Sequence, residues 1–404
     1  MQLWNAAVTH RPAEVVTCRN VDDVRSALGR GSPLSVRGGG HDWAGRAIRP
    51  GGLMLDLSGM REVTVEGDVA TAAGGATLLE VMTAAQTTGQ AVVAGSVGAV
   101  GLAGLALGGG YGPLMGRAGL AADNIVGADV VLADGTLVRD DPDLLWALRG
   151  GGGNFGVVTA LRLRLQPVAT VLAGHVMFGL GQARDVLTGL GAILGELPDD
   201  LTLSCGILCA PDGTPLLFVG PTWAGEPAAG REWIARIEAL GRPVANTVAV
   251  VAPTVPLERG DAMFAPDGRH YAIRTVNVEA LPIDALLAGE AARTSPLSML
   301  NMHHFHGAAA RVPVEATAFG LRRDHLMVEI IGAWRPGDGT RDSGWADQVA
   351  ELMRPSALPG GYPNLLGPDH HEQIRDAYGP NAHRLRELKQ RFDPDGVFAA
   401  IPLP

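Results

Sequence analysis

RGGGH, at residues 37–41, follows a short apolar run at 34–36 and opens the most glycine-rich part of the chain. Two further glycine clusters follow at residues 95–112 and 150–156. The chain has 404 residues and 56 glycines, and 28 of these glycines lie between Gly38 and Gly156. Glycine loses more backbone entropy on folding than other residues, so such density is costly unless the backbone must approach something closely. We therefore take the three clusters as the leading evidence for a binding site.

The composition is that of a globular protein, with 47% hydrophobic and 18% charged residues, and the length suggests two or three domains. A net charge of −10 without a Lys/Arg block disfavours nucleic acid and anionic membranes as partners. The single lysine, Lys389, lies in a run expected to be an exposed helix, and no P-loop is present.

Neither a signal peptide nor a transmembrane run is apparent, and three cysteines are too few for a disulfide framework, so we expect a cytoplasmic protein. Cys205 and Cys209 would share one face of a strand at 201–208. A thiol pair is one interpretation, and two ordinary buried thiols are the favoured one.

Short strands and helices alternate irregularly along the first part of the chain. Strands are expected at residues 34–37, 53–57, 63–65, 91–94, 124–133 and 157–166, and helices at 21–28 and 77–88. Longer alternating strands, such as 201–208 and 326–334, follow with helices such as 231–240, and a polar helix is expected at 368–389. This pattern predicts an α+β fold with three segments, at residues 1–168, 169–355 and 356–404.

The dinucleotide fingerprint G-x-G-x-x-G occurs once, at Gly151, Gly153 and Gly156. A helix-like segment precedes it and a strand-like segment follows, which is the reverse of a Rossmann motif, so we reject that site. The 95–112 cluster offers many backbone N–H groups to an anion and room for a flat ring. A tightly packed crossing of two segments is the alternative interpretation of that cluster.

RGGGH after a strand resembles the flavin-attachment motif of berberine bridge enzyme-like and 6-hydroxynicotine oxidase-like flavoproteins, in the vanillyl alcohol oxidase / p-cresol methylhydroxylase superfamily. Further matching pieces follow in order: GGLMLDLSGM at 51–60, GGGYG at 108–112, GLAADN at 119–124, LWALRGGGGNFGVV at 145–158, YPN at 362–364 and RFDPD at 391–395. The resemblance covers nearly the whole chain. It implies a two-subdomain PCMH-type FAD-binding module, formed by the N-terminal part and the chain's end. A substrate domain with a large antiparallel sheet covered by helices completes the implied fold.

The resemblance also implies an FAD-linked oxidase. His41 stands where relatives bond the flavin covalently, and Val97 stands where many carry a second, cysteinyl link, so a single link is expected. Val100 matches the residue that controls oxygen access, which favours oxygen as acceptor and hydrogen peroxide as product. The substrate would be a small or natural-product amine, alcohol or phenol that gives a hydride to flavin N5. A dehydrogenase or an oxidative cyclase of secondary metabolism is the alternative.

Residues matching the family's cofactor site follow from the same resemblance, and amides rather than lysines would neutralise the pyrophosphate. Arg37 is expected to orient the loop. The chain's end lacks the asparagines that usually follow RFDPD, which leaves Asn364 as the polar contact there. The expected cofactor-binding residues are Arg37, Gly38, Gly39, Gly40, His41, Asp42, Gly95, Ser96, Val100, Gly101, Gly104, Leu105, Gly108, Gly109, Asn124, Gly156, Val158 and Asn364.

On the substrate side, the resemblance gives two candidates for a catalytic base, Tyr362 and Glu329. A packing tyrosine and a solvent-facing strand position are the alternatives for these two residues. His304 and His306, on one side of a predicted strand, and Met327 are expected to line the substrate pocket. The histidines at 303–306 suggest a metal site, but no cysteine or acidic cluster flanks them, and no metal is expected.

Two other classes of protein remain open from the sequence. The stretch AGSVG around Ser96 is near a serine hydrolase motif but lacks its first glycine. The second class is a protein that holds a flavin but has little catalytic turnover. Expected partners are a small-molecule substrate and oxygen, and the chain is expected to be a monomer or homodimer.

Overall fold

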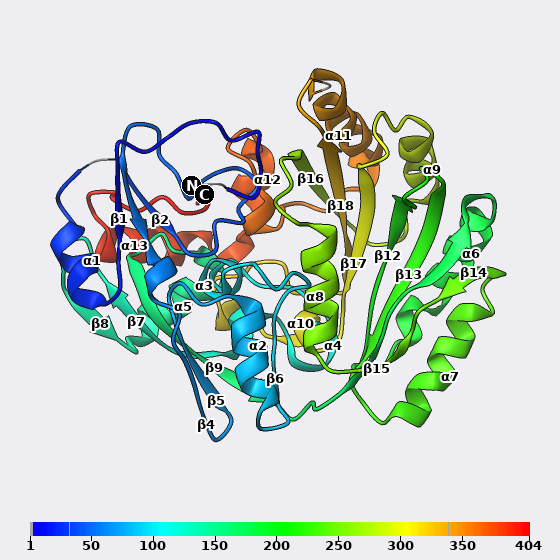
Figure 1. The fold of residues 1–404 in the computed structure, drawn as a ribbon, viewed down its shortest axis with the longest axis horizontal. Coiled ribbons are helices and arrows are strands. Elements are labelled where there is room, and N and C mark those ends of the chain that lie inside the picture. Colours follow the sequence, from blue (N-terminus) through cyan, green and yellow to red (C-terminus); the bar gives the residue numbers. More distant parts are fainter. Residues whose placement is uncertain (1–2, 32, 338) are drawn as a thin grey trace.

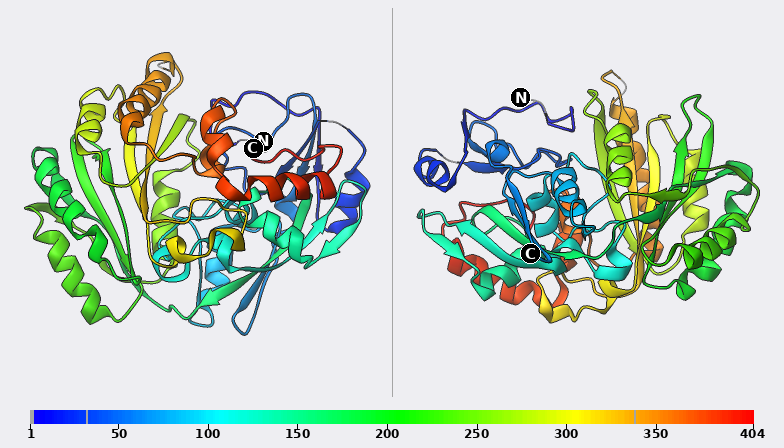
Figure 2. Two further views of the ribbon diagram at one scale, coloured as in Figure 1. Left: turned by 180° about the vertical axis from the view of Figure 1, so that it is seen from behind. Right: turned by 60° about the horizontal axis from the view of Figure 1, so that its bottom comes forward.

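The N-terminal and the middle parts of the chain build separate sheets in this computed structural model, which describes residues 3–31, 33–337 and 339–404. Figure 1 shows the N-terminal part together with the C-terminal helices on one side and the large middle sheet on the other. Figure 2 shows the same division from behind and from below.

The N-terminal part contains a small parallel sheet and a larger antiparallel one. The small sheet has the order β1 (Glu14–Thr17), β3 (Leu53–Asp56), β2 (Leu34–Arg37). The larger has the order β4 (Val63–Glu66), β5 (Val69–Ala73), β9 (Val157–Gln166), β7 (Ile125–Val131), β8 (Leu137–Arg139), with β6 (Ala91–Val92) paired to β9.

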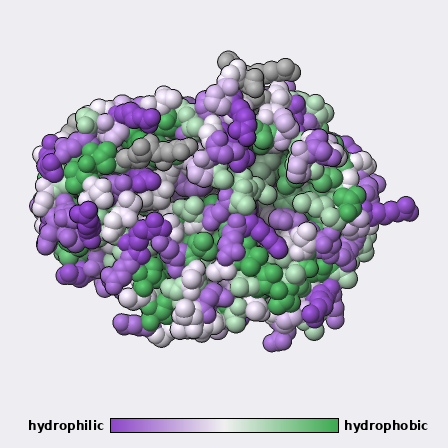
Figure 3. All heavy atoms as spheres, in the orientation of Figure 1, coloured by the Kyte–Doolittle hydropathy of each residue, from purple (hydrophilic) through white to green (hydrophobic). Residues whose placement is uncertain are grey.

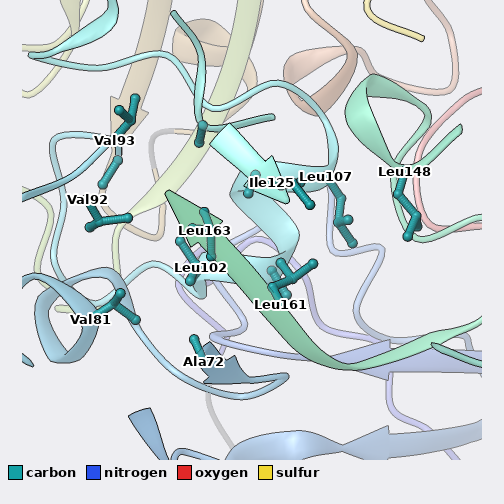
Figure 4. Packing of buried hydrophobic residues seen from close by; sticks show 14 of the residues in the cluster. Ala72, Val81, Val92, Val93, Leu102, Leu107, Ile125, Leu148, Leu161 and Leu163 are labelled. Carbon is teal, nitrogen blue, oxygen red and sulfur yellow. The ribbon is translucent and has the colours of Figure 1, made fainter. Parts of the chain in front are cut away.

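The core of this part forms where β9 meets α2 (Leu78–Gln86) and α3 (Leu102–Leu107). Figure 4 shows Leu161 and Leu163 of β9 among the side chains of these helices. Helix α2 begins with a capping box, in which the Glu80 carboxylate accepts from the Thr77 N–H at 2.8 Å and the Thr77 hydroxyl accepts from the Glu80 N–H. The wall behind the glycine loops is thus a packed apolar layer.

The middle of the chain folds into a nine-stranded sheet. Its main path is β14 (Pro243–Asn246), β11 (Val176–Gly179), β13 (Pro215–Trp223), β12 (Leu201–Cys209), β17 (Met299–Phe305), β18 (His325–Trp334), β16 (His270–Val278), and off this path β10 (Val171–Ala173) pairs with β13 and with β15 (Ala249–Val251). Its pairings are antiparallel.

One face of this sheet packs on helices and the other faces the N-terminal part. The covering helices are α6 (Ala183–Ile193), α7 (Pro227–Glu238), α9 (Ile283–Ala291) and α11 (Gly339–Met353). Leu326, Val328 and Ile330 of β18 point into this apolar layer. The intervening residues of the same strand therefore point toward the N-terminal part.

The remaining helices lie around and between the two parts of the molecule. They are α1 (Val21–Ala27), α4 (Met115–Ala118), α5 (Pro142–Gly151), α8 (Thr254–Met263), α10 (Ala308–Arg311), α12 (His371–Asp376) and α13 (Ala382–Phe392). Helix α8 leaves the middle of the chain to pack on α2, and α13 returns to pack on α5. The expected α+β fold with a large, helix-covered antiparallel sheet is confirmed. The three segment boundaries stay a prediction.

Two expectations about the C-terminal region are wrong. The helix expected at 368–389 is two helices, because Gly379, at φ 47°, and Pro380 interrupt it. Lys389 is not an exposed helix residue: its side chain is 22% exposed and its ammonium donates to the carbonyls of Asn154 and Phe398.

Cys205 and Cys209 are both free thiols; Cys205 is buried, as the favoured interpretation had it, but Cys209 is partly exposed. Among the described helices, none has the length and apolarity needed to cross a bilayer. Figure 3 shows hydrophilic and hydrophobic side chains intermixed over one face of the molecule.

A buried ion pair ties the loop before β18 to the N-terminal part. Arg322 donates to both oxygens of Asp123, at 2.6 and 3.0 Å, and the side chains are 2% and 8% exposed. Its neighbour Arg323 pairs with Glu279 on the surface.

We expect Arg322→Met to lower the free energy of unfolding by about 3–5 kcal/mol, because it leaves the Asp123 charge buried and unpaired. Arg323→Met is the matched control, with an expected loss below about 1 kcal/mol. Urea denaturation of both variants checks the difference, and equal losses would contradict the assignment.

Candidate active site

A cavity of about 490 Å³ lies between the N-terminal part and the exposed face of the large sheet. The glycine loops at 38–40, 95–104 and 152–156 contribute to one wall, and residues of β17 and β18 contribute to the other. The chain's end closes part of the wall with residues 398–401. All three glycine clusters identified in the sequence thus meet at one cavity.

The glycines of this wall have two separate roles. A Cβ on Gly39 would lie 2.3 Å from the backbone nitrogen of Gly101, and one on Gly112 would lie 1.8 Å from the carbonyl oxygen of Ala94. These glycines permit segments to cross at backbone contact, as the alternative interpretation proposed. Gly104, by contrast, lines the cavity with open space where its Cβ would be, so it leaves bare backbone available to a ligand.

Contacts with β3 and with the C-terminal segment hold the RGGGH loop. The Arg37 guanidinium donates to Asp56 at 3.0 and 3.1 Å and is not part of the cavity wall. Gly40 has φ 70°, and a Cβ there would meet Arg37 Nε at 2.7 Å. Asp42 accepts from Arg46, at 3.0 Å from its Nε, and Arg46 also donates to the carbonyl of Asn364. The loop is therefore anchored to β3 and to the C-terminal segment.

His41 faces the cavity with its ring stacked on Trp4, at 4.7 Å between centroids and 20° between planes. Trp4 stacks in turn on Tyr271 at 3.9 Å and donates its indole N–H to the carbonyl of Phe264. Burial lowers the pKa of His41 to about 4. The imidazole is thus neutral at physiological pH, and a neutral imidazole nitrogen can act as a nucleophile.

Glu329 lies on the cavity-facing side of β18 and is 7% exposed, so it is not a solvent-facing strand position. Three groups surround its carboxylate: Asn301 Nδ2 at 3.3 Å, His303 Nε2 at 3.4 Å and the Tyr111 hydroxyl at 3.5 Å. Burying a carboxylate is costly unless polar partners compensate. These contacts hold Glu329 in the wall of an otherwise apolar strand.

Tyr362 lines the cavity from the C-terminal segment. Its hydroxyl accepts a hydrogen bond from the Gly110 N–H at 2.5 Å, and its ring meets Tyr111 edge-on at 5.0 Å. Burial raises the pKa of Tyr362 to about 12 and that of Tyr111 well above its usual value. Both phenols are protonated at neutral pH.

Most of the residues expected at the site lie in the cavity wall. These are Gly38, Gly39, Gly40, His41, Asp42, Gly95, Ser96, Val100, Gly101, Gly104, Leu105, Gly156, Val158, Glu329, Tyr362 and Asn364.

Arg37, Gly108, Gly109 and Asn124 support the wall from behind. A Cβ on Gly108 would overlap Asn364, and one on Gly109 would press on Tyr362, so these two glycines make room for the C-terminal segment. Asn124 donates to the carbonyls of Ala118 and Leu120, which braces a turn.

His304, His306 and Met327 do not line the cavity, contrary to expectation. His304 stacks on His306 at 4.6 Å and bonds Asp324 at 2.8 Å, while His306 bonds the Leu201 carbonyl at 2.9 Å. It is the alternate residues of β17, including His303, that face the cavity. Met327 is fully buried under the tyrosines. In the described ranges, no cluster of three or more His, Cys, Asp or Glu side chains could hold a metal ion.

Several cavity residues had no signal of their own in the sequence. Tyr111 belongs to the GGGYG motif, and nothing in that motif gives the tyrosine a role. Asn301 and His303 enter the site only because their strand lies beside β18. Knowing the register of β17 against β18 would have identified both residues.

Comparisons with known proteins agree with this geometry. The FAD binding domain family matches residues 12–141, and the family described as berberine and berberine like matches residues 361–401. The chain is 30% identical to (R)-6-hydroxynicotine oxidase of Paenarthrobacter nicotinovorans over 98% of this chain and 92% of that protein. It is 29% identical to the FAD-linked oxidoreductase aurO of Gibberella zeae, over 99% of this chain and 82% of that protein.

Two solved structures have the same fold. The 6-hydroxy-D-nicotine oxidase of Arthrobacter nicotinovorans superposes with a TM-score of 0.87 at 26% identity, covering 99% of this chain and 93% of that one. Berberine bridge enzyme from Eschscholzia californica has a TM-score of 0.87 at 23% identity, covering 98% and 91%.

The residues present fit an FAD. The cavity wall offers side-chain-free backbone at Gly104, and a neutral imidazole at His41 faces the same space. Backbone amides can meet a pyrophosphate without a lysine. This chain belongs to the FAD-dependent oxidoreductases of the berberine bridge enzyme and 6-hydroxynicotine oxidase family.

Proposed function

We propose that this protein is an oxidase whose FAD is attached to His41, and that it oxidises a C–H bond of a small organic molecule with oxygen as acceptor. The observation that carries the proposal is the position of His41 and Glu329, which line one cavity from the two halves of the molecule. The N-terminal half supplies the neutral imidazole of His41, beside glycine-rich backbone. The large sheet supplies the buried carboxylate of Glu329.

The glycine-rich wall is the proposed cofactor side. Backbone N–H groups of 38–41 and of Gly101, Ala103 and Gly104 would meet the pyrophosphate, and Asn364 would supply a side-chain contact. A bound FAD would supply the hydride acceptor for oxidation of the substrate carbon. The stack of Trp4 on His41 holds the imidazole in place for attachment.

Glu329 is the proposed base. A substrate O–H or N–H must lose a proton as the adjacent carbon loses hydride, and a carboxylate in the wall can accept it. Tyr362, with a pKa of about 12, stays protonated and serves as a donor instead. Asn301 and His303 orient the carboxylate of Glu329.

The sheet wall is the proposed substrate side. Met299, Ile331, Phe218 and Leu208 give this wall an apolar surface beside Glu329. Such a wall suits an amine, an alcohol or a phenol with an apolar or aromatic body. One relative is named for the oxidation of 6-hydroxynicotine, a small heteroaromatic amine.

Val100 lies in the cavity wall, and the choice of oxygen as acceptor rests on this residue and on the resemblance that assigns it to oxygen access. Dehydrogenases and oxidative cyclases would use the same wall with a different acceptor or product. Release of hydrogen peroxide during turnover separates the oxidase from the dehydrogenase. The cytoplasmic location and the monomeric or dimeric state stay predictions.

We expect the flavin of the purified protein to remain with the acid precipitate, and the flavin of His41→Ala to pass into the supernatant. The reason is that removal of the imidazole leaves only non-covalent contacts to the cofactor. Absorbance of the two fractions measures this, and His383→Ala, an exposed histidine of α13, is the matched control. Flavin retained by His41→Ala would show that another residue carries the link.

For the base, we expect Glu329→Gln to lower the rate of anaerobic flavin reduction by about 10²–10⁴-fold, since general-base catalysis contributes about that much. The substrate would be one found by screening amines, alcohols and phenols for peroxide release. Tyr362→Phe is the comparison variant, and it should lose less than about tenfold because its phenol is already protonated.

A larger loss in Tyr362→Phe than in Glu329→Gln would make the tyrosine the base. If no member of the panel bleaches the flavin, the protein is a flavin-holding module and not an oxidase.

A further inference from the structure

An arginine without a carboxylate partner stands at the rim of the cavity. Arg259 lies on α8, is exposed, and contributes to the cavity wall. Among the ion pairs and hydrogen bonds of the described ranges, none joins its guanidinium to an acidic side chain. The other arginine in the cavity lining, Arg46, is already paired with Asp42. Arg259 is therefore a cation available to a ligand.

The sheet opposite Arg259 carries a cluster of small and polar residues. Gly220 lies in the middle of β13 and lines the cavity with Ser204 and His175. A Cβ on Gly220 would lie 2.6 Å from Ser204 Oγ and 3.1 Å from His175 Cδ2. Glycine inside a strand often marks a place where a ligand or another group approaches the backbone. The glycine thus lets the hydroxyl and the imidazole come together on the cavity floor.

His175 connects this cluster to the arginine. Leu257 of α8 and Ala173 of β10 belong to one apolar cluster, and two residues beyond them Arg259 and His175 both line the cavity. Burial lowers the pKa of His175, and the Arg259 charge lowers it further. A neutral imidazole can donate one hydrogen bond to an anion, and the Ser204 hydroxyl, which donates to the Gly220 carbonyl at 3.3 Å, can rotate to donate to the anion instead. The guanidinium adds the charge and further donors.

The sheet register gives the separation of this cluster from Glu329. Glu329 pairs with Asn301 on β17, Asn301 with Gly206 on β12, and Gly206 with Phe218 on β13, so the apolar Phe218 lies straight across the sheet from Glu329. Ser204 and Gly220 lie two residues further along their strands. Strand spacings of about 4.8 Å and an offset of about 7 Å along the strands place Ser204 about 12 Å and Gly220 about 16 Å from Glu329, so the centre of the cluster is about 14 Å away.

We propose that Arg259, His175 and Ser204 form a subsite for an acidic group of the substrate, at the end remote from the oxidised carbon. The substrate is then an elongated, largely apolar molecule with a carboxylate about 14 Å from the atom that Glu329 deprotonates. The Glu329 charge repels the acidic group, so the two ends of the cavity fix one orientation. This inference rests on the proposed function, because it places the substrate on the sheet wall.

The test uses the flavin-loaded protein and two probes of equal shape, biphenyl-4-carboxylate and its neutral carboxamide. Calorimetry gives the Kd of each probe for the wild type, for Arg259→Gln and for Arg164→Gln. Arg164 is an exposed arginine of β9 outside the cavity wall, so its variant changes the net charge equally.

We expect Arg259→Gln to raise the Kd of the carboxylate about tenfold or more, since it loses a charge-assisted hydrogen bond. The Kd of the carboxamide should change less than twofold, and Arg164→Gln should leave both values unchanged. Ser204→Ala should also raise the Kd of the carboxylate and not that of the carboxamide, by a smaller factor than Arg259→Gln does.

Other outcomes overturn the inference. Equal Kd values of the carboxylate for the wild type and Arg259→Gln mean that no acid subsite exists, even though the flavin is bound. A loss of flavin content in Arg259→Gln assigns the guanidinium to the cofactor. Failure of the proposed function is seen separately, as a wild-type protein that holds no flavin.

Discussion

The backbone contact between Gly39 and Gly101 is the constraint on which the cavity depends. A Cβ on either residue would come within 2.4 Å of the other's backbone nitrogen, so the two loops can cross only where both residues lack a side chain. This crossing sets the RGGGH loop against the 95–112 loop. His41 reaches the cavity from the first loop, and Gly104 lines it from the second. These glycines cost conformational entropy, but they allow a close backbone crossing that residues with side chains could not make.

The opposite wall is a sheet with two different faces. Residues of β18 alternate between an apolar layer under helices and the cavity, which places Glu329 beside Ile331 and away from Val328. The buried carboxylate is tolerated because Asn301, His303 and Tyr111 surround it. Polar groups from adjacent strands, and not from adjacent residues, make this site.

The N-terminal segment holds the two walls at a fixed separation. Asn5 donates to the carbonyls of Trp43 and Tyr271 and accepts from the Tyr271 N–H, so it bridges the RGGGH side and the sheet. Trp4 lies between His41 and Tyr271 in the same place. The imidazole is therefore positioned by a stack that includes a residue of the large sheet. The N-terminal segment thus contacts both walls of the cavity.

The sequence by itself determined the family, the glycine clusters and most of the short elements, because these depend on local features. RGGGH and the alternation of the strand at 326–334 can each be recognised from neighbouring residues, and Glu329, a candidate from the sequence, does face the cavity. It also indicated that Arg37 orients its loop, which its ion pair with Asp56 explains.

Only the tertiary structure decided which face of β17 meets the cavity. Period-two alternation separates His303 from His304 and His306 but does not say which set points inward, since that depends on the partner strand and the layer behind it. The same holds for Arg259, whose helix leaves the middle of the chain to pack on α2. Local pattern determines what a residue can do, and long-range packing determines which residues share a site.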